Sequence, residues 1–567
     1  MNLTKVIEQS VDKLIKELGI AKIDYGVDHP AEIKHGDYAV NVAMVGYRQV
    51  KDKFKSPQEL ADKIVEKLKA EEKMNKIAEK ITVEGPGFIN ISIKNEVLVR
   101  EIGRLLKGVS KKGSFWGKKV MVEYAHPNTH KEFHIGHLRN IALGESISRI
   151  LEAVGTKVIK TNYQGDVGLH IAKAMWGIKQ NIAEYEKVKK QDVFAKVKYL
   201  GKIYSVGGQA YEKDKKAKEE ILDFNEQIYA EKGEIVALWK ETVKWSLDYF
   251  DKIYKRVGTK FDRLYFESEC TDGVDIAKKA LKKGILKKSQ GAVVFDGSKY
   301  GLDTRVFITK KGLPTYEAKE LSLAPKEFAE FGEIDKNIHV VGPEQQSFFS
   351  VTFKVEELID PKRFKGKQYH RVYAYVKLKK GKMSSRKGQI VTGWWLLDEA
   401  KKRIMKNYKA KEAVAEKIAV GAVKYAFLKV QPLSEIVFDF EESISLEGNS
   451  GPYLQYTYAR CKSVLNKADL QDFSVKVKKL EKEEEYLLRT IYRFGEVVEE
   501  AAKELSPNLV ANFLYDLAQK YNSFYNKHPI LKAEKEKKEL RLWLTQTVAK
   551  VIKDGLVLLG IETLERM

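Results

Sequence analysis

Residues 119–137 read KVMVEYAHPNTHKEFHIGH and begin a strand–helix–strand pattern. An apolar-rich strand is predicted over 119–125, followed by a helix over about 135–154 that Gly155 ends in a left-handed turn. A second strand is predicted over 157–162. A strand, a helix and a strand in this order form a βαβ unit with parallel strands. The pattern therefore predicts an open α/β sheet in this part of the chain.

His134, Gly136 and His137 lie where the first strand of this unit passes to its helix. Open α/β sheets bind phosphates there, because the helix N-terminus offers unpaired backbone donors and the positive end of its dipole. Two histidines at positions i and i+3 share one side of a helical turn, and glycine lets a nucleotide approach the backbone. A histidine pair alone is more often structural or an incidental metal site. Its position at this turn favours stabilisation of charge on a phosphate.

A second cationic segment, residues 379–388, reads KKGKMSSRKG. Its glycines are suited to a loop that closes when ATP is bound, and a positioned lysine such as Lys382 can neutralise a pyrophosphate leaving group. By itself, the segment also fits a general nucleic-acid-binding patch.

Together, these two segments resemble the HIGH and KMSKS motifs of class I aminoacyl-tRNA synthetases, in the expected order. The surrounding sequence resembles the arginyl branch of that class over nearly the whole chain. This second resemblance is carried by VEYAHPNT (122–129), NYQGDVG (162–168), PTY (314–316), EGNSGPYLQY (447–456) and the ending LGIETLERM (559–567). It implies an arginine–tRNA ligase, which activates L-arginine with ATP and transfers it to the 3′ end of tRNA(Arg) for use in translation.

The resemblance implies a multidomain α/β plus α fold in three parts. Residues 1–112 are expected to form an α+β domain that contacts the tRNA elbow, and residues 113–392 a Rossmann-like catalytic domain with a parallel sheet. A helical insertion is expected at about 180–255, which is rich in Lys, Glu and Tyr at helical spacing. Residues 393–567 are expected to form a helical connective and anticodon-binding bundle. The parallel sheet is expected to be completed by strand-like segments at 292–295, 306–309, 338–341 and 372–376.

The resemblance also assigns an ATP site around the two motifs. His134 and His137 are expected to stabilise the α-phosphate, and Lys382 the pyrophosphate. The second lysine of KMSKS is replaced by Ser385, so another cation must take its role; Lys131 is our first choice and Lys387 the second. The ATP-binding positions are expected at Gly136, Gly165, Asp166, Met383, Ser384 and Lys387. ATP is expected to act as its Mg²⁺ complex.

Arginine selectivity requires carboxylates that match the planar guanidinium, together with an aromatic wall. The matching family positions are Glu267, Tyr316 and Glu320. Relatives often carry aspartate at the last position, so glutamate lengthens that arm by one methylene. Helical spacing puts Tyr316 and Glu320 on one face of a helix. The α-amino and α-carboxylate groups are expected to meet Glu123, Asn128 and Gln345, with Gln346 as the alternative to Gln345.

Contacts with tRNA are expected in the first and last domains, where aromatic side chains stack on unpaired bases. For a tyrosine within a helix, packing in the core is an equally open interpretation. The positions that match the family are Phe88, Asn90, Tyr453, Tyr456, Arg460, Tyr525 and Met567.

Composition limits the remaining possibilities. The formal net charge of +23 fits a polyanionic partner such as tRNA, and fits a lysine-rich surface equally well. Cys270 and Cys461 are the only cysteines, so neither a disulfide framework nor a zinc site is expected, and no metal ligands are assigned. Residues 1–25 lack a signal-peptide pattern and no long apolar run occurs, so a cytoplasmic protein without membrane contact is expected. A monomer is the default expectation.

Two other interpretations remain. One is another class I enzyme, such as a cysteinyl or lysyl synthetase, although a cysteinyl enzyme would be expected to carry zinc-ligand cysteines and a valyl or isoleucyl enzyme a large editing insertion. The other is a catalytically silent RNA-binding relative with the same fold. The presence of His134, His137 and Lys382 argues against silence.

Overall fold

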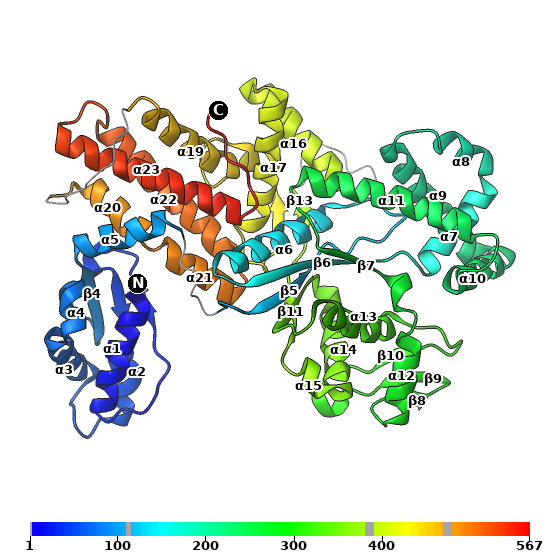
Figure 1. Ribbon diagram of the computed structural model, residues 1–567, viewed down its shortest axis with the longest axis horizontal. Helices are drawn as coiled ribbons and strands as arrows, with labels where there is room; N and C mark the ends of the chain where they lie inside the picture. The colour runs from blue at the N-terminus through cyan, green and yellow to red at the C-terminus, as the bar shows by residue number, and fades with distance from the viewer. Residues whose placement is uncertain (1–2, 109–114, 380–390, 469–478) are drawn as a thin grey trace.

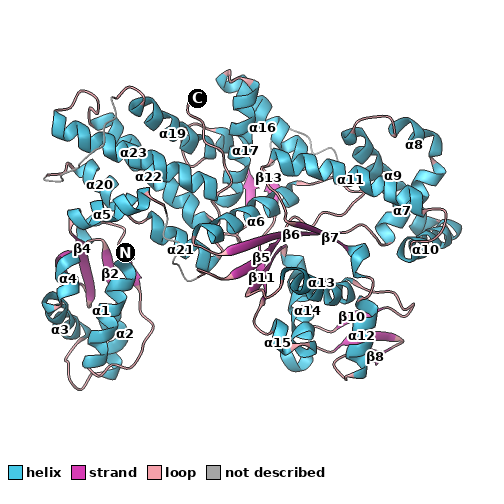
Figure 2. Cartoon of the chain, viewed as in Figure 1, coloured by secondary structure: helices cyan, strands magenta, loops and turns pink. Residues whose placement is uncertain are grey.

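The computed structural model describes residues 3–108, 115–379, 391–468 and 479–567. The chain forms an N-terminal α+β unit, a central α/β unit and a C-terminal bundle of helices (Figure 1), which confirms the predicted fold class. Figure 2 shows the strands concentrated in the first two units. Within these described ranges, no helix is long and apolar enough to cross a membrane.

The N-terminal unit is a small antiparallel sheet packed against helices. Its core holds the alternating Ile89, Ile91 and Ile93, which are fully buried and share a hydrophobic cluster with residues of the first helix, such as Ile7. The strand order is β1 (Val27–Asp28), β2 (Tyr38–Val40), β4 (Phe88–Ile93), β3 (Ala78–Glu84). The helices are α1 (Leu3–Glu17), α2 (Val42–Gly46), α3 (Pro57–Ala70), α4 (Glu72–Ile77) and α5 (Asn95–Leu106).

A buried ion pair joins this unit to the C-terminal bundle. Arg489 Nη1 lies 2.5 Å from Asp37 Oδ2, and both side chains are almost fully buried. Beside it, His29 Nε2 lies 2.9 Å from Glu496 Oε2, and the hydroxyl of Tyr38 donates to Glu496 Oε1 over 2.9 Å. Because buried charges are costly unless paired, these contacts fix how the two units dock.

The central sheet contains five parallel strands, as predicted for residues 119–125 and 157–162. The strand order is β12 (Gln368–Val372), β11 (Lys336–Val341), β5 (Lys119–Glu123), β6 (Lys157–Gln164), β7 (Arg263–Phe266). The chain places β5, β6 and β7 side by side, and then returns to place β11 on the other side of β5. The strand order therefore reverses between β5 and β11. In open α/β sheets, ligands bind at the carboxyl ends of the strands at such a point.

The helical segment between β6 and β7 forms its own core. Its helices lie at the end of the molecule opposite the N-terminal unit (Figure 1), and Met175, Leu200, Phe224 and Trp245 pack together in one cluster. The predicted insertion at residues 180–255 lies within this segment. The helices are α7 (Leu169–Gln180), α8 (Ile182–Val188), α9 (Val193–Lys213), α10 (Lys215–Ala230) and α11 (Val236–Arg256).

The expectation that residues 292–295 and 306–309 complete the parallel sheet is wrong. They correspond to β9 (Ala292–Phe295) and β10 (Arg305–Ile308), which pair antiparallel in a separate sheet with β8 (Lys287–Ser289). Short connections join these strands, and short connections favour hairpins over crossovers. The helices around this sheet are α12 (Gly273–Lys282), α13 (Tyr316–Phe331), α14 (Gln346–Ile359) and α15 (Pro361–Phe364).

The C-terminal part is helical, as predicted, with Phe513, Leu517, Tyr521 and Phe524 buried along one helix. A short parallel pair of strands, β13 (Val376–Leu378) and β14 (Ile436–Phe438), links it to the central unit. The helices are α16 (Gly393–Tyr408), α17 (Glu412–Leu428), α18 (Phe440–Ile444), α19 (Gly451–Leu465), α20 (Lys482–Ile491), α21 (Phe494–Glu504), α22 (Asn508–Lys527) and α23 (Lys535–Leu558).

Candidate active site

Helix α6 (Ile135–Ala153) begins at the carboxyl end of β5, and its first turn carries the histidine pair. The rings of His134 and His137 stack with their centroids 3.7 Å apart. Gly136 N–H donates to His134 Nδ1 over 3.1 Å, and His134 N–H donates to His137 Nδ1 over 3.1 Å. Each Nδ1 therefore accepts a hydrogen bond, and a neutral ring must carry its proton on Nε2.

The surroundings keep both rings neutral. Burial, followed by the charge of Lys131, lowers the pKa of His134. Burial and the neighbouring His134 place the pKa of His137 well below its ordinary value. The pair thus presents two Nε2–H donors beside a helix N-terminus, an arrangement suited to phosphate oxygens.

Lys131, the first choice for the missing motif cation, lies near this pair. Its Nζ atom lies 5.1 Å from the centroid of the Tyr204 ring. Burial, followed by the charge of Lys173, lowers the pKa of Lys131. The structure therefore brings Lys131 together with His134 and His137.

Lys382, Met383, Ser384, Ser385 and Lys387 lie outside the described residues. The flank after their segment is tied to the site through the backbone, and the flank before it is tied to β14. On one side, Ile135 N–H donates to Val391 O over 3.0 Å, and Gly393 N–H donates to Phe133 O over 2.7 Å. On the other side, Lys379 N–H donates to Phe438 O over 3.0 Å. The residues that follow the second motif, Val391 and Gly393, are therefore joined to the first motif through the backbone on either side of His134.

Two buried residues that the sequence analysis missed brace helix α6. Asn140 accepts from Ala125 N–H over 2.6 Å and donates to Val340 O over 2.7 Å, so it joins the ends of β5 and β11. The guanidinium of Arg139 donates to four backbone carbonyls, those of Ala374, Tyr375, Pro432 and Ser434. The sequence signal that could have identified Asn140 and Arg139 was their polar character on a helix that is otherwise mostly apolar.

The next group of predicted residues gathers at the ends of β6 and β7. Asn128 forms a bridge with Gly165, and a Cβ atom on Gly165 would lie 2.1 Å from Asn128 Oδ1. Only glycine fits there without displacing the asparagine. Asp166 accepts from both the N–H and the hydroxyl of Ser268, over 2.9 and 2.6 Å. Its buried carboxylate therefore fixes the turn that carries Glu267.

Glu267 already has a cationic partner, which sequence reasoning did not find. Lys319 Nζ lies 2.5 Å from Glu267 Oε2, and both residues are buried. The same ammonium lies 5.3 Å from the centroid of the Tyr316 ring. Although burial acts against a charged lysine, Glu267 outweighs it and raises the pKa of Lys319. Glu267, Tyr316 and Lys319 thus form one charged and aromatic group.

Glu123 and Glu320 lie together at the base of the crevice. His339 Nδ1 donates to Glu123 Oε1 over 3.0 Å, and His126 Nδ1 lies 3.6 Å from the same oxygen. Burial lowers the pKa of a histidine, but the charge of Glu123 and their hydrogen bond raise the pKa of His339 to about 9. Glu320 is 2% exposed and its Oε1 atom has no hydrogen-bond partner among the described residues. Glu320 is therefore a buried carboxyl with one oxygen that has no partner among the described residues.

Two of the predicted arginine-site residues are less enclosed than the others. Tyr316 is the first residue of α13 and is 55% exposed, whereas Glu320 on the same helix is buried. Gln345 is exposed on the 3-10 turn Pro343–Gln345, and Gln346 beside it is also exposed. Their roles toward arginine stay predictions.

Four predicted tRNA-facing residues meet in the C-terminal bundle. The guanidinium of Arg460 lies 4.9 Å from the Tyr456 ring centroid and 5.0 Å from that of Tyr525. Asn522, which the sequence analysis missed, accepts from Arg460 Nη1 over 2.5 Å and donates to the Tyr453 hydroxyl over 2.8 Å. These five side chains form a half-exposed cluster of aromatic and cationic groups on α19 and α22.

The other predicted tRNA residues differ in access. Phe88 is 38% exposed and Met567 is 41% exposed, so both side chains are available at the surface. Asn90 is only 6% exposed, because it lies within β4 between Ala39 and Thr82 of the neighbouring strands. Its contribution to RNA binding stays a prediction.

Within the described residues, no group of three or more His, Cys, Asp and Glu side chains is arranged to hold a metal ion. Cys270 and Cys461 are both free and buried.

Comparison with known families assigns this architecture. A family model described as tRNA synthetases class I (R), catalytic domain, matches residues 102–440. The chain belongs to the arginyl-tRNA synthetase family. Two further models of this family's modules match the flanking regions: Arginyl tRNA synthetase N terminal domain at residues 1–93, and DALR anticodon binding domain at residues 454–567.

Individual relatives of the arginyl-tRNA synthetase family align over the full length. The chain is 33% identical to an arginine–tRNA ligase of Porphyromonas gingivalis, over all of both chains, and 33% identical to that of Treponema denticola, over 94% of this chain and 92% of the relative. Its fold matches the Thermus thermophilus arginyl-tRNA synthetase over both whole chains, with a TM-score of 0.83 at 26% identity. The Plasmodium falciparum arginyl-tRNA synthetase gives the same TM-score at 20% identity, which shows the shared fold.

Proposed function

We propose that this chain is an arginine–tRNA ligase that activates L-arginine with ATP and transfers it to the 3′ end of tRNA(Arg) in translation. The observation that carries this proposal is the set of side chains that gather, with Asn128, at one edge of the central sheet. A neutral histidine pair at the start of α6 and the buried carboxylates of Glu123 and Glu267 lie at the carboxyl edge of one parallel sheet. Such a crevice offers donors for phosphate and acceptors for a cationic amino acid.

In the first step, the arginine α-carboxylate attacks the ATP α-phosphate, and arginyl-adenylate and pyrophosphate result. The Nε2–H groups of His134 and His137 donate to the oxygens of the α-phosphate, where negative charge increases in the transition state. Lys131 and the motif lysine Lys382 neutralise the leaving pyrophosphate, with Lys387 as the second choice for the missing cation. Mg²⁺ enters with ATP, because this ion is usually held by substrate phosphates rather than by a protein cage.

In the second step, the terminal ribose hydroxyl of the tRNA attacks the arginyl carbonyl and AMP leaves. No side chain becomes covalently attached, so catalysis rests on positioning and on charge stabilisation. Gly136, Gly165 and Asp166 form the nucleotide side of the site, together with Met383 and Ser384.

Arginine is selected through its guanidinium and its α-amino end. Glu267 and Glu320 supply carboxylates for the guanidinium, and Tyr316 supplies the aromatic wall. Glu123, Asn128 and Gln345 bind the α-amino and α-carboxylate groups. Lysine fits this site poorly, because its ammonium cannot form the paired hydrogen bonds that a guanidinium forms with a carboxylate.

Binding of tRNA engages both ends of the molecule. Phe88 and Asn90 of the N-terminal unit contact the elbow. Anticodon bases contact the bundle through Tyr453, Tyr456, Arg460, Tyr525 and Met567. A monomer suffices for this arrangement, because one chain contains every part that the reaction needs.

Pyrophosphate exchange measured with and without tRNA tests whether tRNA must bind before arginine is activated. We expect arginine-dependent exchange only when tRNA is present, as is typical of arginyl enzymes. Equal exchange rates in both conditions would contradict this order. Exchange that requires cysteine or lysine would favour another class I enzyme, and no exchange with any amino acid would favour a silent RNA-binding relative.

A further inference from the structure

A series of buried polar side chains runs behind the proposed arginine pocket, and of its members only Glu123 lies in one of the motif segments. Asn337 Nδ2 donates to Glu327 Oε2 over 2.8 Å. The other oxygen of Glu327, Oε1, and Glu123 Oε2 are buried and have no hydrogen-bond partner among the described residues, and the two carboxyls interact electrostatically. From Glu123, the series continues through His339 Nδ1 over 3.0 Å. Asn337, Glu327, Glu123 and His339 are all at most 1% exposed.

Beyond His339, the amide of Gln368 determines which groups donate and which accept in the next hydrogen bonds. Gln368 Nε2 donates to Glu356 Oε2 over 2.8 Å, so the amide oxygen of Gln368 must accept from His339 Nε2 over 3.2 Å. Both nitrogens of His339 therefore donate, as they do in an imidazolium. An imidazolium facing Glu123 requires that Glu123 be the ionised carboxylate.

The two unpartnered oxygens of Glu123 and Glu327 are both satisfied if the carboxyls share a proton. Two ionised carboxylates cannot hydrogen bond to each other, because neither has a donor. Glu123 Oε2 and Glu327 Oε1 are buried, and no other described residue donates to either atom. Glu123 faces His339 and His126, whereas Glu327 accepts only from Asn337 among the described residues. The proton therefore belongs to Glu327, which donates to Glu123.

The titration behaviour of the pair agrees with this geometry. Burial, followed by the charge of Glu123, raises the pKa of Glu327 well above its ordinary value. Burial also acts to raise the pKa of Glu123, but the charge of His339 and the hydrogen bonds to His339 and Glu327 outweigh it and lower that pKa. These directions favour the protonated form of Glu327 and the ionised form of Glu123.

We propose that Glu327 is a positioning residue for arginine binding, which holds the Glu123 carboxylate at the base of the pocket through a donated hydrogen bond. This inference rests on the proposed function, in which Glu123 meets the α-amino end of arginine. Glu327 does not touch the substrate. It fixes the rotamer of a carboxylate that is carried on a flexible two-methylene side chain and has no other donor on its second oxygen among the described residues.

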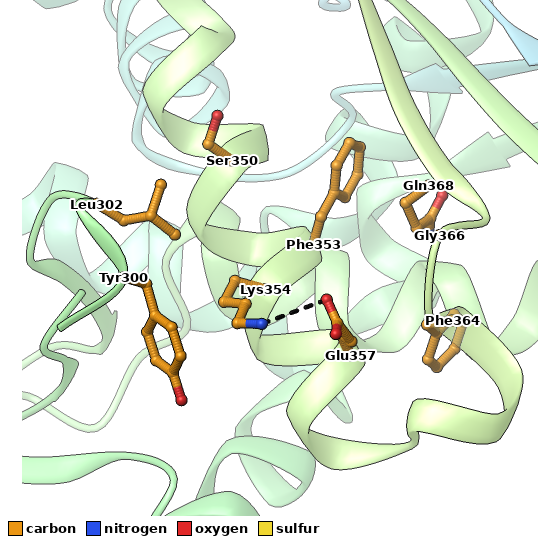
Figure 3. A pocket seen from close by; sticks show the side chains of 9 residues that line it. All are labelled: Tyr300, Leu302, Ser350, Phe353, Lys354, Glu357, Phe364, Gly366 and Gln368. Atoms are coloured by element: carbon orange, nitrogen blue, oxygen red, sulfur yellow. Dashed lines mark ion pairs between the residues drawn. The ribbon is translucent and has the colours of Figure 1, made fainter. Parts of the chain in front are cut away.

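The other end of this series of side chains, at Gln368 and Glu356, is less constrained. Gln368 lines a cavity of about 370 Å³ beside α14, together with Phe353, Phe364 and Tyr300 (Figure 3). Figure 3 also shows Lys354 paired with Glu357 across 3.4 Å in the wall of this cavity. Solvent in the cavity can replace contacts of Gln368, whereas Glu327 is 0% exposed and has no such substitute. The positioning role therefore lies at Glu327 rather than at Gln368.

Three substitutions at residue 327 separate this role from general stability. Glu327→Gln keeps a donor of the same length, so the KM for arginine should stay within about threefold of the parent value. Glu327→Asp withdraws the group by one methylene, and Glu327→Leu removes it. A buried acceptor left without its donor is costly, so each should raise the KM for arginine about tenfold or more. The KM for ATP should change less than about twofold in all three.

Glu330→Leu is the matched control, because Glu330 lies one turn further along α13 and pairs outward with Arg263 and Tyr265. It should leave the KM for arginine unchanged. If the leucine variant does not fold, the comparison of Glu327→Asp with Glu327→Gln still decides. A glutamine variant as impaired as the aspartate variant, or equal changes in KM for ATP and for arginine, would overturn the proposal. The parent enzyme is assayed first, so that failure to charge arginine is recognised as failure of the proposed function.

Discussion

His134 and His137 stack face to face at the first turn of α6, and each holds a backbone N–H on its Nδ1 atom. This leaves both Nε2 atoms as donors without making either ring a cation. A neutral donor pair can follow the charge that develops on a phosphate and does not depend on a protonation event near neutral pH. The same hydrogen bonds cap the helix, so the turn's local structure and its proposed chemistry depend on the same atoms.

Substitution of His137 should distinguish its two nitrogens. Glutamine places an N–H donor near the position of Nε2, whereas asparagine places its polar group near Nδ1. We expect His137→Asn to lower the rate of arginine-dependent pyrophosphate exchange about 100- to 1000-fold, and His137→Gln to retain substantially more activity. The KM for arginine should change little in either variant. Equal losses in the two variants would argue against Nε2 as the donor.

Arginine binding should depend on pH through Glu320. Burial raises the pKa of Glu320 to about 8, with the charge of Glu123 adding to this effect and that of His339 opposing it. A neutral Glu320 must lose its proton to pair with the guanidinium, so protons compete with arginine. The dissociation constant for arginine should therefore fall about tenfold per pH unit as the pH rises toward 8, and then level off.

Calorimetry in buffers of different ionisation enthalpy measures the proton released when arginine binds near pH 7. Glu320→Gln should abolish the pH dependence and the proton release, and it should weaken binding above pH 8. A dissociation constant that stays the same from pH 6.5 to 8.5 in the parent chain would rule out this linkage.

The aromatic cluster on α19 and α22 should matter for tRNA and not for arginine. Asn522 holds Arg460 and Tyr453 in place, so Asn522→Ala should raise the KM for tRNA between about fivefold and a hundredfold, the effect of losing base stacking. The KM values for arginine and ATP should stay within about twofold. Gln519→Ala, one turn away at an exposed position of α22, is the control. A comparable rise in this control would show that the cluster has no special role.

The buried pair of Asp37 and Arg489 should govern docking of the N-terminal unit. Asp37→Ala removes the buried carboxylate partner of Arg489 and leaves only the more exposed Glu485, so it should destabilise the folded protein by about 3–5 kcal/mol. Urea unfolding measures this change, and limited proteolysis should cut between the units more readily. In a double-mutant cycle, Arg489→Ala should add less to Asp37→Ala than it costs alone. Additive effects would mean that the two residues do not depend on each other.

Local patterns in the sequence predicted the βαβ unit of the fold and the histidine pair of the site. The βαβ unit follows from a strand, a helix and Gly155 in succession, and the histidine pair follows from its position at the turn. The strands at 292–295 and 306–309 show the limit of this reasoning, because a strand pattern does not name the partner strand. Short connections gave them an antiparallel sheet of their own.

The missed residues share one property: they act through contacts between distant segments. Asn140 joins the ends of β5 and β11, Lys319 reaches Glu267 across two elements, and His339 faces Glu123 from a neighbouring strand. Apart from the polar position of Asn140 on an otherwise apolar helix, nothing within a window of the sequence distinguishes them from ordinary polar residues. Burial of their charges becomes visible only when the sheet and helices are assembled, and burial is what gives them their effect.

Aminoacylation of total tRNA with each of the twenty amino acids, one at a time, directly tests whether the chain is an arginine–tRNA ligase. We expect that only arginine is esterified to tRNA in an ATP-dependent reaction, and that lysine is rejected despite its positive charge. Charging of lysine, cysteine or any other amino acid in preference to arginine would contradict it, as would the absence of charging with all twenty.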